Sequence, residues 1–122
     1  MAVDAGQIHA IGLSNGGRVV SHLFASSRGG YRSFVFLSPV FREESVRALA
    51  HATVNEKASI FVITGVLDRR VPFSYVENNV RGIRAAGANV TFEPMENADH
   101  FLIFVEREKV MAKLERWLKS TQ

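Results

Sequence analysis

The feature that most constrains the fold is a regular alternation of short apolar segments with helix-like segments. Short runs rich in β-branched or aromatic residues predict strands at 7–13, 33–38, 58–64 and 89–93. Apolar residues at i, i+3 and i+4 predict helices over 16–26, 41–51, 73–86 and 103–118. This order is typical of an α/β protein, in which helices form the outer two of three layers and a mostly parallel sheet of about four strands lies between them.

Each predicted helix carries an apolar face that should pack on the sheet. The residues expected on these faces are Val19, Val20, Leu23 and Phe24, then Val46, Leu49 and Ala50, then Phe73, Val76, Val80 and Ile83, and finally Val110, Met111, Leu114, Trp117 and Leu118.

Composition narrows the class of protein. The 122 residues suit one domain and include no cysteine, which excludes disulfides, thiolate metal sites and cysteine nucleophiles. No apolar run approaches the ~18 residues of a membrane span. The net charge is +3, and the basic residues are scattered along the sequence, with only Arg69 and Arg70 adjacent. A surface that binds nucleic acid is therefore not expected. Metal-ligand spacing and nucleotide-binding loops are also missing, so we expect no metal and no cofactor. The absence of cysteine fits a cytoplasmic protein, which is the location we expect.

A serine motif follows the first predicted strand. Gly12, Ser14 and Gly16 form Gly-x-Ser-x-Gly between a strand and a helix. A sharp turn there exposes the serine hydroxyl and needs small neighbours. The backbone N–H of Asn15 can then bind a developing oxyanion.

A serine nucleophile needs a base and a carboxylate that orients it. Of the four histidines, only His100 follows a strand end in a loop, whereas His9 lies within a strand and His22 and His51 lie in helices. Asp68 follows the third strand, although a turn-forming or ion-paired aspartate would look the same. The chain order Ser14, Asp68, His100 is the order of a triad built on this type of turn.

Three segments resemble the carboxyl-terminal half of an α/β-hydrolase. They are 12–17 (GLSNGG), 63–72 (ITGVLDRRVP) and 97–101 (NADHF). The likeness is to esterases similar to dienelactone hydrolases, carboxylesterases and polyhydroxybutyrate-depolymerase-like esterases. It implies that Ser14 is the nucleophile, His100 the general base and acid, and Asp68 the orienting carboxylate. It also implies hydrolysis of short or medium acyl esters through an acyl-enzyme; thioester hydrolysis or acyl transfer stays open.

The chain departs from that family before the serine. Only six residues precede Gln7, and no His-Gly-Gly-type segment is present to supply a second oxyanion donor. We therefore expect residues 1–122 to form a single half-size domain. The 54 positions from Ser14 to Asp68 leave no room for a cap or lid between them. The segment Gln7–Leu13 would be an edge strand, which favours pairing with a second copy. The alternative function is a split half-domain that acts as an assembly or binding module with a vestigial triad.

Apolar residues near the strand ends are the expected lining of a shallow ester cleft, with ordinary core packing as the alternative. They are Phe41, Leu67, Val71, Phe101 and Leu102.

Overall fold

The structure, a computed structural model, describes residues 4–26, 30–42, 44, 46–47 and 58–121. Its elements in chain order are the 3-10 helix η1 (Ala5–Gln7), β1 (His9–Leu13), α1 (Gly16–Ser26), β2 (Ser33–Leu37), β3 (Ser59–Gly65), α3 (Phe73–Ala85), β4 (Asn89–Met95), α4 (Leu102–Val105) and α5 (Arg107–Ser120). Most of the predicted helix over 41–51 lies outside the described residues, including the expected positions Leu49 and Ala50.

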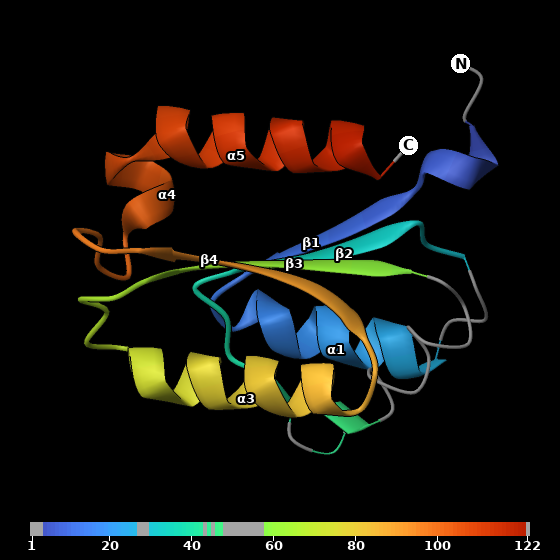
Figure 1. The fold of residues 1–122 in the computed structure, drawn as a ribbon, viewed down its shortest axis with the longest axis horizontal. Coiled ribbons are helices and arrows are strands. Elements are labelled where there is room, and N and C mark those ends of the chain that lie inside the picture. The colour runs from blue at the N-terminus through green and yellow to red at the C-terminus, as the bar shows by residue number, and fades with distance from the viewer. Residues whose placement is uncertain (1–3, 27–29, 43, 45, 48–57, 122) are drawn as a thin grey trace.

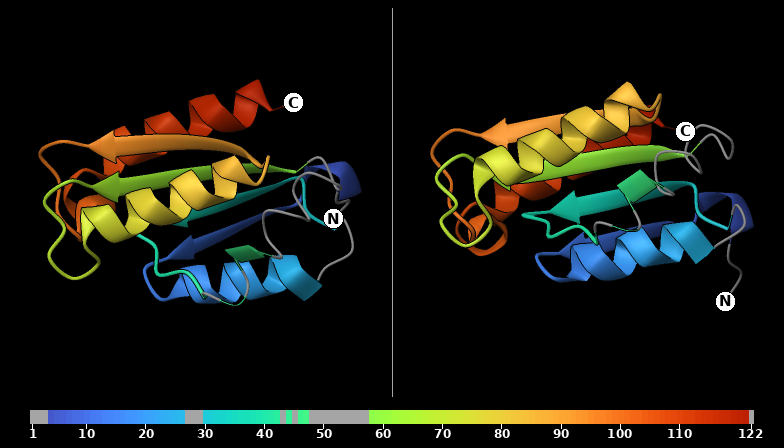
Figure 2. Two further views of the ribbon diagram at one scale, coloured as in Figure 1. Left: turned by 60° about the horizontal axis from the view of Figure 1, so that its bottom comes forward. Right: turned by 90° about the horizontal axis from the view of Figure 1, so that it is seen from below.

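Four parallel strands form the middle layer in the order β1-β2-β3-β4. Helices α1 and α3 cover one face of the sheet, and α5 covers the other (Figure 1). The predicted three-layer α/β architecture is therefore confirmed. All four strands point the same way, so their carboxyl ends and the loops that follow them lie at one end of the sheet (Figure 2).

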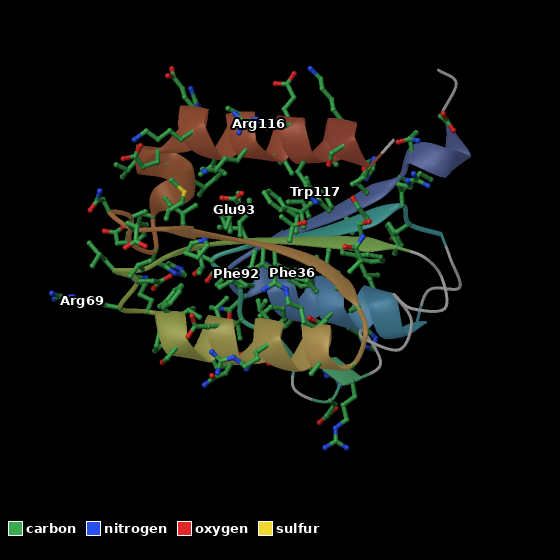
Figure 3. The ribbon with its side chains drawn as sticks, in the orientation of Figure 1. Phe36, Arg69, Phe92, Glu93, Arg116 and Trp117 are labelled. Atoms are coloured by element: carbon green, nitrogen blue, oxygen red, sulfur yellow. The ribbon has the colours of Figure 1, made fainter. Side chains whose placement is uncertain are left out.

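Side chains that alternate along the central strands make two cores, one on each face of the sheet. Phe36 and Phe92 lie on the face that α1 and α3 cover, whereas Trp117 lies between the sheet and α5 (Figure 3). The Trp117 ring stacks on Phe61 with centroids 4.9 Å apart. Every residue of β2 is buried, which is the expected consequence of covering both faces.

Three sequence predictions about local structure are wrong. Strand β4 continues through Pro94 to Met95, because β4 lies at an edge of the sheet that the structure describes. A proline there can lack an N–H where no ladder bond is needed. The last helix is broken at Glu106, whose φ of −112° and ψ of 31° are not helical. Val19 and Met111 are 60% and 45% exposed, so neither belongs to the buried face of its helix.

Strand β1 forms the other edge of the described sheet and is incompletely covered. Ile11 and Leu13 pair with Val35 and Leu37, which face α5 and are buried. Ile11 itself is 52% exposed and Leu13 38% exposed, because α5 packs over the opposite part of the sheet. Within the described residues, β1 thus has one strand neighbour and one uncovered apolar face.

No helix within the described ranges combines the length and apolar character needed to cross a bilayer.

His9 lies at the end of the sheet opposite Ser14, in surroundings that change its pKa. Its Nδ1 lies 2.6 Å from the hydroxyl oxygen of buried Ser33. Burial of the ring, aided by the charge of Arg32, lowers the pKa of His9 below its ordinary value of 6.5. Folding therefore favours the neutral imidazole.

The unfolded chain should bind a proton at His9 more readily than the folded chain does. The contribution of His9 to stability is complete above the unfolded pKa and is lost as the pH falls through the lower, folded pKa. We expect the free energy of unfolding to fall more steeply between about pH 7.5 and pH 5 in the parent than in His9→Gln, measured by urea unfolding. Equal slopes would show that His9 titrates alike in both states.

Candidate active site

The Ser14 turn is held in a conformation that serine rarely adopts. Its φ is 53°, in the left-handed region that costs a non-glycine residue energy. Backbone hydrogen bonds offset this cost. The Ser14 N–H donates to the Leu37 carbonyl at 2.9 Å, and the Ser14 carbonyl accepts from the N–H groups of Gly17 at 2.9 Å and Val40 at 3.0 Å. The hydroxyl therefore leaves the strand end in a defined direction.

Two side-chain hydrogen bonds connect Ser14, His100 and Asp68. The Ser14 Oγ lies 3.0 Å from His100 Nε2, and His100 Nδ1 lies 2.8 Å from Asp68 Oδ2. The three residues follow the carboxyl ends of β1, β3 and β4, and 86 positions separate Ser14 from His100 in the sequence. The structure thus brings together all three residues that the sequence analysis selected.

The partners of the imidazole assign its tautomer. A carboxylate only accepts hydrogen bonds, so Nδ1 donates to Asp68 and the lone pair of Nε2 faces the Ser14 hydroxyl. The Asp68 side chain is fully buried, and its second oxygen accepts from the N–H groups of Arg70 and Val71, both at 2.8 Å. This arrangement can take the serine proton while Asp68 stabilises the imidazolium.

Close backbone contacts hold the loops at the ends of the strands against one another. A Cβ at Gly65 would overlap the Ala98 carbonyl, and the N–H of Leu67 donates to that same carbonyl at 3.0 Å. The loops that carry Asp68 and His100 are therefore packed backbone to backbone. Gly17 makes an equivalent approach to Val40, which follows β2.

Ser38 is a site residue that the sequence analysis missed. It follows β2 directly, with a φ of 46°, is fully buried, and donates a long hydrogen bond of 3.4 Å from its hydroxyl to the His100 carbonyl. Its N–H donates to the Ile63 carbonyl at 2.8 Å. A serine before a proline carries no sequence signal of a left-handed conformation, so only the fold identifies it.

Asn15 lies at the position expected of an oxyanion donor. It comes directly after Ser14 and before α1 (Gly16–Ser26), and its carbonyl accepts from Arg18 at 3.1 Å. Its own N–H donates no hydrogen bond within the part of the chain that the structure describes. That N–H is free to bind an oxygen that develops charge.

The residues predicted to line the cleft separate into two groups. Leu67 and Phe101, which are 57% and 41% exposed, line a cleft of about 500 Å³ beside His100. Leu102 also borders this cleft, although it is almost fully buried. Phe41 and Val71 are buried core residues and border a second hollow. For these two, packing into the core is the main role that the structure assigns.

Among the described residues, no group of three or more histidine, aspartate or glutamate side chains could hold a metal ion.

Comparison with known proteins identifies the fold. No protein-family model and no curated protein match the sequence. Three similar solved structures are a carboxylesterase of Bacillus cereus (24% identity, TM-score 0.68), esterase Est2 of Thermogutta terrifontis (17%, 0.69) and a proposed dienelactone hydrolase of Klebsiella pneumoniae (21%, 0.75). The matches cover 98%, 95% and 95% of this chain but only 52%, 55% and 53% of those proteins.

The chain therefore has the α/β-hydrolase fold and spans about half the length of these structures. The predicted resemblance to the carboxyl-terminal half of an α/β-hydrolase is confirmed at the level of the fold.

The two adjacent glycines after Asn15 provide a matched test of the turn. In Gly17→Ala the new Cβ would overlap the Val40 carbonyl, whereas the Cβ in Gly16→Ala would meet nothing within 4 Å. We expect Gly17→Ala to lower the free energy of unfolding by about 1–3 kcal/mol. Gly16→Ala should be neutral or stabilise by up to about 1 kcal/mol. Urea unfolding of both variants checks this, and equal stabilities would contradict the close packing of the turn.

Proposed function

We propose that the protein is a serine hydrolase that cleaves short or medium carboxylic esters through an acyl-enzyme on Ser14. The observation that carries this proposal is the continuous chain of two hydrogen bonds, 3.0 and 2.8 Å long, from Ser14 through His100 to buried Asp68. The esterases and hydrolases among its structural neighbours support the same class of reaction.

In the first half-reaction, the Ser14 Oγ attacks the ester carbonyl carbon as its proton moves to Nε2 of His100. The Asn15 N–H donates to the oxyanion of the tetrahedral intermediate. The C–O bond to the alcohol then breaks, and His100 returns the proton to the departing oxygen. This step releases the alcohol and leaves an ester between the acyl group and Ser14.

In the second half-reaction, water attacks the acyl-enzyme. His100 Nε2 takes a proton from the water, and the resulting intermediate collapses to release the carboxylic acid. The proton then returns from His100 to the Ser14 oxygen, which restores the starting state. Leu67 and Phe101 supply apolar surface for the substrate beside His100. The cleft that they line is open to solvent.

Replacing the nucleophile tests the proposal. We expect Ser14→Ala to hydrolyse p-nitrophenyl acetate at least about 10³-fold more slowly than the parent, because the acyl-enzyme cannot form. Ser120→Ala is the control, since its hydroxyl donates to the Trp117 carbonyl on α5. A fluorophosphonate probe should label Ser14 in the parent. Unchanged hydrolysis in Ser14→Ala would overturn the proposal, and folded protein without labelling would favour the assembly module.

We also propose that the free edge of β1 pairs with β1 of a second copy about a two-fold axis. Residues 9–13 carry no aspartate, glutamate, lysine or arginine, so antiparallel self-pairing brings no such like charges together. The pairing would satisfy open backbone groups. Centred on Ile11, the middle residue of β1, it would place the Ile11 side chains of the two copies, each 52% exposed in the single chain, next to each other. A sheet of eight strands would result.

A charge on the uncovered face of β1 tests the pairing. We expect the parent to be a dimer at micromolar concentration and Ile11→Lys to be a monomer, because two lysines would meet at the pair axis. Met111→Lys on α5, at a site that is 45% exposed, should remain a dimer. Size-exclusion chromatography with light scattering measures all three. A monomeric parent, or a dimeric Ile11→Lys, would contradict self-pairing through β1.

A further inference from the structure

A hollow of about 1,370 Å³ lies between helix α1 (Gly16–Ser26), the segment after β2 and the start of α3 (Phe73–Ala85). Four arginines from three parts of the chain line it: Arg18 on α1, Arg42 and Arg47 in the segment after β2, and Arg70 before α3. Buried Phe41 and Val71 also border it, as does half-buried Tyr75. The hollow thus combines an apolar part with a cationic rim.

The hollow adjoins the proposed nucleophile. Val40 lines it, and the N–H of Val40 donates to the Ser14 carbonyl at 3.0 Å. Arg18 lies in the first turn of α1, and its N–H donates to the Asn15 carbonyl at 3.1 Å. The hollow therefore lies next to the turn that carries Ser14.

Arg70 connects the hollow with the cleft beside His100, because it lines both. Its guanidinium lies 4.8 Å from the centroid of the Phe101 ring, a cation–π contact. The same ring meets His100 edge-on at 5.7 Å. The Arg70 N–H donates to Asp68, so both the backbone and the side chain of Arg70 are tied to the site.

The positive charge of the hollow is largely uncompensated among its described lining residues. Glu44 is their one acidic residue and pairs with Arg42 at 3.2 Å. Arg18, Arg47 and Arg70 pair with no carboxylate in the part of the chain that the structure describes. The lining thus carries a formal charge of +3, from four arginines and one glutamate, which equals the net charge of the entire chain.

We propose that this hollow binds an anionic group, a carboxylate or a phosphate, of the ester or thioester that reacts at Ser14. The inference rests on the proposed function and names its substrate class. Guanidinium groups match the geometry of carboxylate and phosphate oxygens and can bind them in pairs of hydrogen bonds. A concave surface with a single sign of charge also attracts such substrates from solution.

Matched substrates test the inference. The measurement compares kcat/KM within two pairs. Neutral p-nitrophenyl butyrate is paired with the mono-p-nitrophenyl ester of glutarate, which carries a carboxylate on the acyl side. The neutral thioester S-butyryl-N-acetylcysteamine is paired with butyryl-coenzyme A, whose phosphates lie on the leaving group. We expect the parent to prefer one of the anionic substrates to its neutral counterpart, and the preference to fall as salt is raised. The favoured anionic substrate identifies the source of the anion.

The variants are Arg18→Gln, Arg47→Gln and Arg70→Gln, with Arg116→Gln as the control on α5, across the sheet from α1 (Figure 3). In each of the first three, the ratio of anionic to neutral kcat/KM should fall by about tenfold. The ratio is the readout because a general loss of triad geometry lowers kcat/KM for the anionic and the neutral substrate alike, so its effect cancels in the ratio. A ratio that is the same in all four variants and in the parent overturns the inference.

A binding measurement separates this inference from the proposed function. Glutarate, or 3′-phosphoadenosine 5′-phosphate as a phosphate probe, should raise the unfolding temperature of Ser14→Ala. The rise should be lost in Ser14→Ala/Arg18→Gln/Arg70→Gln and kept in Ser14→Ala/Arg116→Gln. Anion binding without hydrolysis of any ester would retain the anion site and reject the esterase. Hydrolysis without any preference for charged substrates would retain the esterase and reject the anion site.

Discussion

The site depends on how one buried carboxylate is satisfied. Asp68 is out of contact with solvent, and an unpaired charge there would cost several kcal/mol. Its oxygens accept three hydrogen bonds, two from backbone N–H groups of its own loop and one from His100. The loop bonds fix the direction of the carboxylate, and the carboxylate then fixes both the tautomer and the orientation of the imidazole that faces Ser14.

The sheet makes this arrangement possible because all its strands are parallel. Loops that follow neighbouring parallel strands meet at one edge, so residues far apart in the chain become neighbours. Backbone contacts then bring the loops closer than side chains would allow. Gly65 lies against Ala98, Gly17 lies against Val40, and the two left-handed serines, Ser14 and Ser38, turn the chain sharply at adjacent strand ends. Strain at the site is thus offset by hydrogen bonds between loops.

The surroundings of the triad are asymmetric in charge and in coverage. One side carries the arginine-lined hollow, and its positive charge gives a physical basis for selecting anionic substrates. At the edge of the described sheet, β1 presents exposed Ile11 and Leu13 and an open row of backbone groups. Both features lie next to the elements that hold Ser14.

The sequence by itself determined the order of strands and helices, a buried strand over 33–38, the turn around Ser14 and the choice of Asp68 and His100. Local periodicity, glycine spacing and chain order are all properties of the sequence alone. Only the tertiary structure decided that β4 runs through Pro94, that the last helix breaks at Glu106 and that Ser38 is left-handed. These features depend on which strand lies at an edge and which loops touch. Such contacts are made by residues distant in the chain, and no local pattern encodes them.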